Sequence, residues 1–200
     1  MRTESYHLNG KQIVIPIPES YKDCITLIKS DRYRITGKEE SSISLIRRNL
    51  RHINSSTLFW LRLNQYRGWL EPICRKMYAY VSRKSQIQIP ASTKIGYGLY
   101  IGHSMCMVVD GGTVIGNNVN LSQFLNIGTN HNTPAIIGDN VYIGPQVCII
   151  EDVIMGNNST IGAGAVVTKD VPENATVAGV PAKVLNFNNP GRYVDNLWPQ

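Results

Sequence analysis

The sequence has no long apolar segment, and this absence argues against a helix that spans a membrane. No stretch approaches the roughly 18 consecutive apolar residues that such a helix needs. The first ten residues, MRTESYHLNG, contain no apolar core of the kind found in a secretory signal. We therefore expect a soluble, cytoplasmic protein.

Cysteine is also scarce, and its spacing is typical of neither a disulfide framework nor a zinc site. The four cysteines, at positions 24, 74, 106 and 148, form no CxxC pair. We expect reduced thiols that mostly occupy buried positions as small apolar side chains, and we expect no metal cofactor.

Acidic residues are too few in the first part of the chain to balance the basic ones. Residues 1–85 contain 16 Lys/Arg and 7 Asp/Glu, a net charge of +9, whereas residues 86–200 contain 4 and 7, a net charge of −3. This asymmetry predicts a boundary near Ser85, between an N-terminal helical region (1–85) and a second domain (86–200). Helices are expected within 18–37, 41–53, 56–67 and 68–85, from apolar spacing and from capping Ser and Thr residues.

The basic surface of these helices has two interpretations. It is a solvated surface with an oligomer interface, or it makes a peripheral membrane contact through apolar residues interleaved with cations. The residues of the second interpretation are Phe59, Trp60, Leu61, Leu63, Trp69 and Leu70, with Arg62, Arg67, Arg75 and Lys76. No nucleic-acid-binding signature is visible, so we expect no nucleic-acid partner.

A six-residue period dominates the second domain. Apolar residues recur in three series, Ile95–Ile101–Met107, Ile115–Leu121–Ile127 and Ile137–Ile143–Ile149–Met155–Ile161–Val167. Neither a helix nor a flat strand has this period, whereas it is typical of a parallel β-helix. Each unit would give a short strand and a corner occupied by Gly, Asn or Asp, and three units would close a coil of about 18 residues.

Two insertions interrupt this period. Two extra residues lie within 107–115, and four extra residues lie within 127–137. Counted in threes, both insertions fall at the same corner of successive coils, which predicts two stacked loops on a rigid scaffold. The first loop would carry Asp110 and the second His131, and His103 would lie on the strand that leads toward them.

Three motifs follow one another along the second domain: GLYIGH (98–103), NLSQ (120–123) and AGVPAKV (178–184). With them, the second domain resembles the hexapeptide-repeat acyltransferases, and most closely their serine O-acetyltransferase branch, which includes capsule and exopolysaccharide acetyltransferases. The resemblance implies a left-handed parallel β-helix. It also implies a homotrimer, or a hexamer of two trimers, with acetyl-CoA in a groove between neighbouring subunits.

By the same resemblance, His103 is the catalytic general base, which takes the proton of an acceptor hydroxyl as it attacks the thioester. His131 is a second candidate catalytic residue, in a loop shorter than that of serine acetyltransferases. Gly102 and Gly111 stand where that branch carries acidic residues. Asp110 is therefore the candidate for substrate binding, and Asp110 or a main-chain carbonyl is the candidate for orienting His103.

The stretches GAGAVVTKDVP (162–172) and AGVPAKV match those that line acetyl-CoA in the family. By this match, Gly144 and Ala163 contact the pantetheine arm through the main chain. Thr168, Lys169 and Lys183 lie near the adenosine phosphates, which lysines meet as mobile point charges. Gly144 and Ala163 also suit a tight corner on size alone.

The acceptor stays open at this point. L-Serine, and with it a place in cysteine biosynthesis, is the first candidate, and a sugar hydroxyl of a capsule, exopolysaccharide or lipopolysaccharide is the second. Two further classes fit less well. A γ-type carbonic anhydrase needs three His ligands where the coils have His103 and His131, and a non-catalytic β-helix scaffold does not account for the loops or the cofactor motifs.

Overall fold

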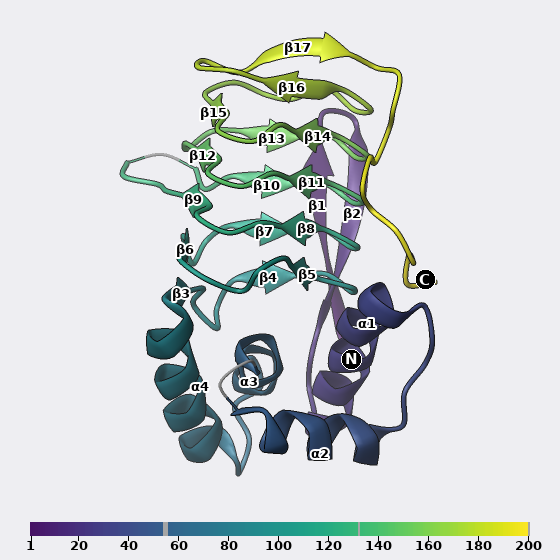
Figure 1. The fold of residues 1–200 in the computed structure, drawn as a ribbon, viewed down its shortest axis with the longest axis vertical. Coiled ribbons are helices and arrows are strands. Elements are labelled where there is room, and N and C mark those ends of the chain that lie inside the picture. The colour runs from purple at the N-terminus through teal and green to yellow at the C-terminus, as the bar shows by residue number, and fades with distance from the viewer. Residues whose placement is uncertain (54–55, 132, 200) are drawn as a thin grey trace.

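The computed structural model describes residues 1–53, 56–131 and 133–199. It shows a stack of triangular coils with helices at one end and a two-stranded hairpin along one side (Figure 1). The chain runs from the hairpin through the helices into the first coil, and then climbs the stack toward the opposite end (Figure 1).

Four turns of three short strands form the coils. The first turn comprises β4 (Lys94–Ile95), β5 (Tyr100–Ile101) and β6 (Met107–Val109), and the second comprises β7 (Val114–Ile115), β8 (Asn120–Leu121) and β9 (Asn126–Ile127). The third comprises β10 (Ile136–Ile137), β11 (Tyr142–Ile143) and β12 (Cys148–Ile149), and the fourth comprises β13 (Ile154–Met155), β14 (Thr160–Ile161) and β15 (Val166–Val167). The short strand β3 (Ile87–Gln88) precedes these turns, and β16 (Thr176–Ala178) and β17 (Lys183–Asn186) follow them.

Equivalent strands stack into three parallel sheets, one for each face of the coil. We name them the β4 face (β4, β7, β10, β13), the β5 face (β5, β8, β11, β14, β16) and the β6 face (β3, β6, β9, β12, β15). The strand β17 joins the β5 face in the antiparallel sense. The predicted parallel β-helix is therefore confirmed, and its left-handed sense stays a prediction.

The apolar residues of the six-residue period form the core of the coils. Ile115, Ile137 and Met155 stack in register on one face, and all three are fully buried. Burying one aliphatic side chain of this size contributes about 1.5–3 kcal/mol. A similar contact recurs at every level, so the stack is stabilised by many contributions of comparable size.

Glycine, asparagine and aspartate share the left-handed position at the corners, as predicted, and glycine has a second role in close stacking. A Cβ placed on Gly116 would lie 2.4 Å from the carbonyl oxygen of Gly138 in the next turn, so close stacking requires glycine there. The positive φ occurs two residues after each stacking glycine, at Gly98 (65°), Asn118 (56°) and Asn140 (57°). Asparagine tolerates this left-handed conformation better than most residues do.

The first insertion lies at a different corner from the one predicted. Ile101 pairs with Leu121, a separation of 20 residues (101 to 121). Val109 pairs with Ile127, a separation of only 18 residues (109 to 127). The two extra residues therefore lie between β5 and β6, in the corner 102–106. The corner that begins at Asp110 has regular length, so the prediction of two insertions at one corner was wrong.

Residues 2–17 form a β-hairpin, which corrects the start of the helical region expected over 1–85. The strands β1 (Arg2–Leu8) and β2 (Lys11–Ile17) pair antiparallel. The turn between them is Asn9-Gly10, with positive φ at both residues, a pair that favours tight hairpins. Ile13 and Ile15 are buried and pack with Val114, so the hairpin covers the β4 face.

Four helices follow the hairpin within the segments predicted for them. They are α1 (Tyr21–Thr36), α2 (Ser42–Arg51), α3 (Thr57–Asn64) and α4 (Glu71–Ser85). Ser20 and Ser41 cap the first two, since their hydroxyl groups accept hydrogen bonds from backbone N–H groups of the first turn. None of the helices in the described residues is long and apolar enough to cross a bilayer.

A buried ion pair joins these helices to the first coil. Arg62 of α3 donates to both carboxylate oxygens of Asp31 on α1, each at 2.8 Å. The same guanidinium donates to the carbonyls of Ile95 and Gly96, at 3.0 and 2.7 Å. Asp31 also accepts from the backbone N–H of Leu99 at 2.8 Å. Burial raises the pKa of Asp31, and Arg62 opposes that change.

This packing corrects the residues expected at a membrane surface. Arg62 is fully buried against Asp31. The apolar residues of α3 face the core rather than solvent: Phe59, Trp60, Leu61 and Leu63. Of the residues in that prediction, Trp69, Arg67, Arg75 and Lys76 are exposed.

The C-terminal tail, residues 187–199, covers part of the β5 face. Its Tyr193 ring lies 4.9 Å from the Tyr142 ring, centroid to centroid, and its Tyr193 carbonyl accepts from Asn120 Nδ2 at 2.7 Å. Arg34 of α1 donates to Asn120 Oδ1 at 2.8 Å and to the Asp195 carbonyl at 2.7 Å. Burial lowers the pKa of Arg34 to about 10.

Candidate functional site

The extended corner of the first turn, residues 102–106, carries His103. Two residues of this corner have positive φ, His103 (52°) and Cys106 (48°). The backbone N–H of Cys106 donates to the Ser85 carbonyl at 2.9 Å, which ties the corner to the end of α4. The His103 side chain is exposed. In the part of the chain that the structure describes, neither Asp110 nor a carbonyl hydrogen-bonds to its ring.

Gly144 and Ala163 lie on the same edge of the coil as His103, in the third and fourth turns. We call it the β5/β6 edge, after the faces it separates. The Gly144 N–H donates to the Ile161 carbonyl at 2.9 Å, and a Cβ at Gly144 would lie 2.8 Å from the Ala163 nitrogen. Stacking therefore requires glycine here and occupies its N–H. Ala163 is exposed.

A second edge, between the β6 and β4 faces, carries Asp110 and His131. We call it the β6/β4 edge. Asp110 Oδ1 accepts from the Gly112 N–H at 2.8 Å, which closes a local turn. The backbone N–H of His131 donates to Glu151 Oε2, in the turn above, at 2.9 Å. This bond holds the four-residue insertion against the coil and leaves the His131 side chain exposed.

The predicted phosphate-contacting residues lie farther along the stack. Thr168 and Lys169 are exposed at the fourth-turn corner of the β6/β4 edge. Lys183 is the exposed first residue of β17, which extends the β5 face. Within one chain, these cations therefore belong to two different sides of the coil.

The two edges flank the β6 face, and in the described chain no other element covers that face. The hairpin covers the β4 face, and the tail with α1 covers the β5 face. Outward side chains of the β6 face are exposed: Gln88, Val108, Asn126 and Cys148. His103 and His131 are thus separated by the width of a face and are not brought together by one chain.

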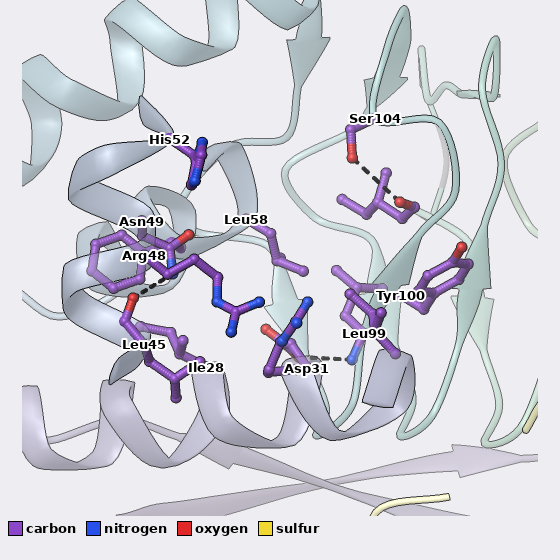
Figure 2. A pocket seen from close by; sticks show the side chains of 14 residues that line it. Ile28, Asp31, Leu45, Arg48, Asn49, His52, Leu58, Leu99, Tyr100 and Ser104 are labelled. Carbon is purple, nitrogen blue, oxygen red and sulfur yellow. Dashed lines mark hydrogen bonds between the residues drawn. The ribbon is translucent and has the colours of Figure 1, made fainter. Parts of the chain in front are cut away.

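A cavity of about 250 Å³ lies between α1, α2 and the first coil, beside the corner of His103 (Figure 2). Ser104, which directly follows His103, lines it, and its hydroxyl donates to the Ile101 carbonyl at 3.3 Å (Figure 2). Tyr100 of the coil also lines it, as do Arg48 and Asn49 of α2 and His52, which caps the end of that helix. The cavity is large enough for a small polar molecule.

The charged side chains around this cavity are paired. Glu40 accepts from Arg32 Nε at 3.2 Å and from Arg48 Nη2 at 2.7 Å. The Ser44 hydroxyl and these arginines lower the pKa of Glu40. Asp31 is the carboxylate that lines the cavity, and Arg62 occupies both of its oxygens. Among the described lining residues, no carboxylate is left to meet an ammonium group.

Sequence reasoning missed the part of the site that α2 contributes. Leu45, Arg48, Asn49 and His52 recur at intervals of three and four residues, which is the spacing of one helix face. This spacing can be read from the sequence, but the sequence does not show that the face packs against α1 and the first coil.

The described residues contain no group of three or more His, Cys, Asp or Glu side chains that could hold a metal ion.

Comparison with known proteins identifies the family. Residues 134–169 match the family described as "Bacterial transferase hexapeptide (six repeats)". The chain is 33% identical over 139 residues to galactoside O-acetyltransferase of Escherichia coli (strain K12), covering 60% of this chain and 68% of that protein. It is 35% identical over 109 residues to serine acetyltransferase 3, mitochondrial, of Arabidopsis thaliana, covering 52% of this chain and 28% of that protein. The chain belongs to the hexapeptide-repeat transferase family.

Solved structures of serine acetyltransferases share the fold. The Neisseria gonorrhoeae enzyme in complex with serine superposes with a TM-score of 0.61 at 28% identity, covering 82% of this chain and 69% of that one. A serine acetyltransferase in complex with CoA superposes with a TM-score of 0.60 at 24% identity, covering 82% of this chain and 68% of that one. The resemblance inferred from the sequence motifs is confirmed.

Proposed function

We propose that the protein transfers the acetyl group of acetyl-CoA to a hydroxyl group of its acceptor, with His103 as the general base. The observation that carries the proposal is the lengthened corner 102–106, where an exposed histidine lies beside a cavity. Family membership supports it, because the relatives named above are acetyltransferases.

The proposed reaction needs no covalent intermediate on the enzyme. The imidazole of His103 takes the proton of the acceptor hydroxyl while the hydroxyl oxygen attacks the thioester carbonyl carbon. The C–S bond of the tetrahedral intermediate then breaks, and the imidazolium returns the proton to the departing thiolate. The products are the O-acetylated acceptor and CoA.

Acetyl-CoA would lie along the β5/β6 edge, from His103 toward the end of the stack. Ala163 is exposed on this path. The N–H of Gly144 is occupied by the Ile161 carbonyl, so Gly144 would contact the pantetheine arm through its own carbonyl. Thr168 and Lys169 from a neighbouring copy, with Lys183, would meet the adenosine phosphates.

The active unit that we propose is a homotrimer formed through the β6 face. In a closed ring of head-to-tail contacts, the β5/β6 edge of one copy meets the β6/β4 edge of the next. His103 and His131 would then reach one site from two chains. Exposed apolar side chains on and beside the β6 face support such an interface: Met105, Val108, Phe124 and Ile150.

The cavity supports a sugar hydroxyl as the acceptor better than L-serine. A site for L-serine must meet an ammonium group, and the lining carboxylate, Asp31, is already paired with Arg62. Asn49 and Tyr100 are polar, uncharged lining side chains that suit hydroxyl groups. The likeness to the galactoside O-acetyltransferase of E. coli supports the same choice.

L-Serine is the second candidate acceptor. The likeness to the N. gonorrhoeae enzyme solved with serine favours it. Asp110 is then the residue to meet the ammonium group, from the neighbouring copy. Replacing Asp110 by Asn should in that case strongly weaken the use of serine and leave acetyl-CoA binding unchanged.

The experiment is a thiol-release assay with acetyl-CoA against L-serine and a panel of sugars that includes galactosides. We expect release above the hydrolysis background with a sugar and none with L-serine. His103→Ala should lower the rate of release by about 10²–10⁴ while acetyl-CoA still binds by calorimetry. His7→Ala, at an exposed histidine of the hairpin, is the matched control. Release with L-serine alone would reverse the choice of acceptor, and absence of acetyl-CoA binding would contradict the proposed function.

A further inference from the structure

The outer side of α2 is apolar and has no partner in the described chain. Leu45 points into the molecule and is buried, whereas Ile43, Ile46 and Leu50 are 65%, 37% and 55% exposed. Residues spaced by three and four positions share one side of a helix, so these three form a stripe. A contiguous exposed apolar stripe on a helix marks a contact with another surface.

Arginines border this stripe. Arg47 and Arg51 are both exposed and lie one helical turn apart beside it. The third arginine of the helix, Arg48, is turned toward Glu40 instead. The whole segment 41–70 contains five Arg and neither Asp nor Glu. The stripe is therefore bordered on one side by two exposed arginines.

The beginning of α4 presents residues of the same kind. Trp69, two residues before α4, is 83% exposed, and Ile73 is 55% exposed. The neighbouring cations Arg67, Arg75 and Lys76 are also exposed. Figure 1 shows α2 and the beginning of α4 at the same end of the molecule, opposite β17. We call the exposed residues of α2 and of this segment the end surface.

We propose that the end surface docks on a lipid bilayer that contains anionic lipids. The apolar stripe and Trp69 would enter the boundary between headgroups and acyl chains, and the arginines would meet lipid phosphates. Trp69, Arg67, Arg75 and Lys76 were expected at such a contact from the sequence, whereas the exposed residues of α2 take the place of the buried ones of α3. The proposal does not depend on the acetyl-transfer reaction or on its acceptor.

A second copy of the chain fits the end surface less well than a bilayer does. Two copies related by a twofold axis would bring Arg47 and Arg51 against cations of the same segment. Segment 41–70 contains no acidic residue to pair with them, and Glu71 at the start of α4 is already paired with Arg75 at 3.6 Å. Like charges across an interface are unfavourable. A bilayer with anionic headgroups meets all of these cations at once.

Vesicle co-sedimentation tests the proposal. The protein should bind vesicles of phosphatidylcholine mixed with phosphatidylglycerol, bind phosphatidylcholine alone weakly, and bind less as salt is added. The pair Ile43→Ser with Leu50→Ser should lower the partition coefficient about tenfold or more, as should Arg47→Glu with Arg51→Glu. The matched control is Leu185→Ser, an exposed apolar residue of β17 at the opposite end, which should bind as the wild type does.

Circular dichroism and gel filtration of each variant accompany the binding assay. The two double variants change different side chains, so one that folds is sufficient for the test. A folded double variant that binds like the wild type overturns the proposal, and so does equal binding to neutral and anionic vesicles. A wild type that binds no vesicles, with variants of lower oligomeric mass, overturns it in favour of an interface between copies.

Discussion

Two edges of the coil flank the uncovered β6 face, and they differ in the residues that line them. The β5/β6 edge carries small residues such as Ala163 above the lengthened corner of His103. The β6/β4 edge carries the insertion of His131, which Glu151 holds, and the exposed Lys169. The first edge thus offers small and exposed residues along its length, and the second offers an exposed histidine and an exposed lysine.

Under the proposed function, this difference means that neither edge is a complete site by itself. A base without a covering loop leaves its substrate in water, and a loop without a base has no reaction to protect. Because the edges are separated by one face, a single chain does not bring them together. A ring of copies joined through that face would do so at every interface.

The largest expected effect is the loss of the base on the β5/β6 edge. His103→Ala should lower the rate of acetyl transfer by about 10²–10⁴, because removing a general base typically has that effect. His131→Ala should have a smaller effect, since the loop covers the site rather than accepting the proton. Steady-state rates of both variants check this order, and an unchanged rate in His103→Ala would sink the assignment of the base.

Mixing the two variants tests whether the edges come from different chains. Subunits of His103→Ala and His131→Ala, unfolded and refolded together in equal amounts, should regain about one quarter of the wild-type sites, because one interface in four then pairs two intact edges. Each variant refolded alone is the control. If the activity of the mixture equals the mean of its two components, both edges act within one chain.

The lysines should affect the cofactor more than the chemistry. Lys169→Ala and Lys183→Ala should each raise the KM for acetyl-CoA roughly three- to tenfold with kcat mostly kept, since phosphate contacts hold substrate and transition state alike. Lys22→Ala, an exposed lysine of α1, is the control. A large fall in kcat at saturating acetyl-CoA would contradict this placement.

The smallest expected effect is a pH-dependent loss of stability beside the cavity. The pKa of Glu40 lies below its ordinary value of 4.5, chiefly because of the Ser44 hydroxyl and also because of Arg48 and Arg32. A lowered folded-state pKa stabilises the protein above pH 4.5, and this stabilisation disappears as the pH falls through the folded-state pKa. Glu40→Gln should therefore lose on the order of 1 kcal/mol or less at pH 7. Urea unfolding at pH 7 and in acid measures both values, and an equal loss at the two pH values would contradict the assignment.

The coils could be predicted from sequence because one short period repeats the same burial at every level. The position of the first insertion could not, since Met107 and Val109 are both apolar and both buried. Only pairing with the neighbouring turns shows which of them continues the series. A strict six-residue period continues from Ile101 to Met107, and this predicts the insertion after Met107 rather than in the corner 102–106.

The helical part was harder to predict because its contacts are long-range. In α3, Arg62 beside Trp60 and Leu63 has the pattern of an interfacial helix. Its true partner, Asp31, lies 31 positions earlier in the sequence. The hairpin was missed although Asn9-Gly10 is a strong turn signal and Ile13 and Ile15 alternate as a half-buried strand does. These signals were outweighed by the helical character of the segments that follow.

The stacking of the coils has one more consequence, which concerns length. His103 lies at the corner of the first turn and Ala163 at the corresponding corner of the fourth. Three strand spacings separate them, roughly 14 Å at about 4.8 Å each. The number of coils thus sets the length of the edge along which we place the pantetheine arm. Inserting or deleting one coil would change the measured span by a single step and leave every corner aligned, so the reach of the site is encoded in a repeat count and not in any one side chain.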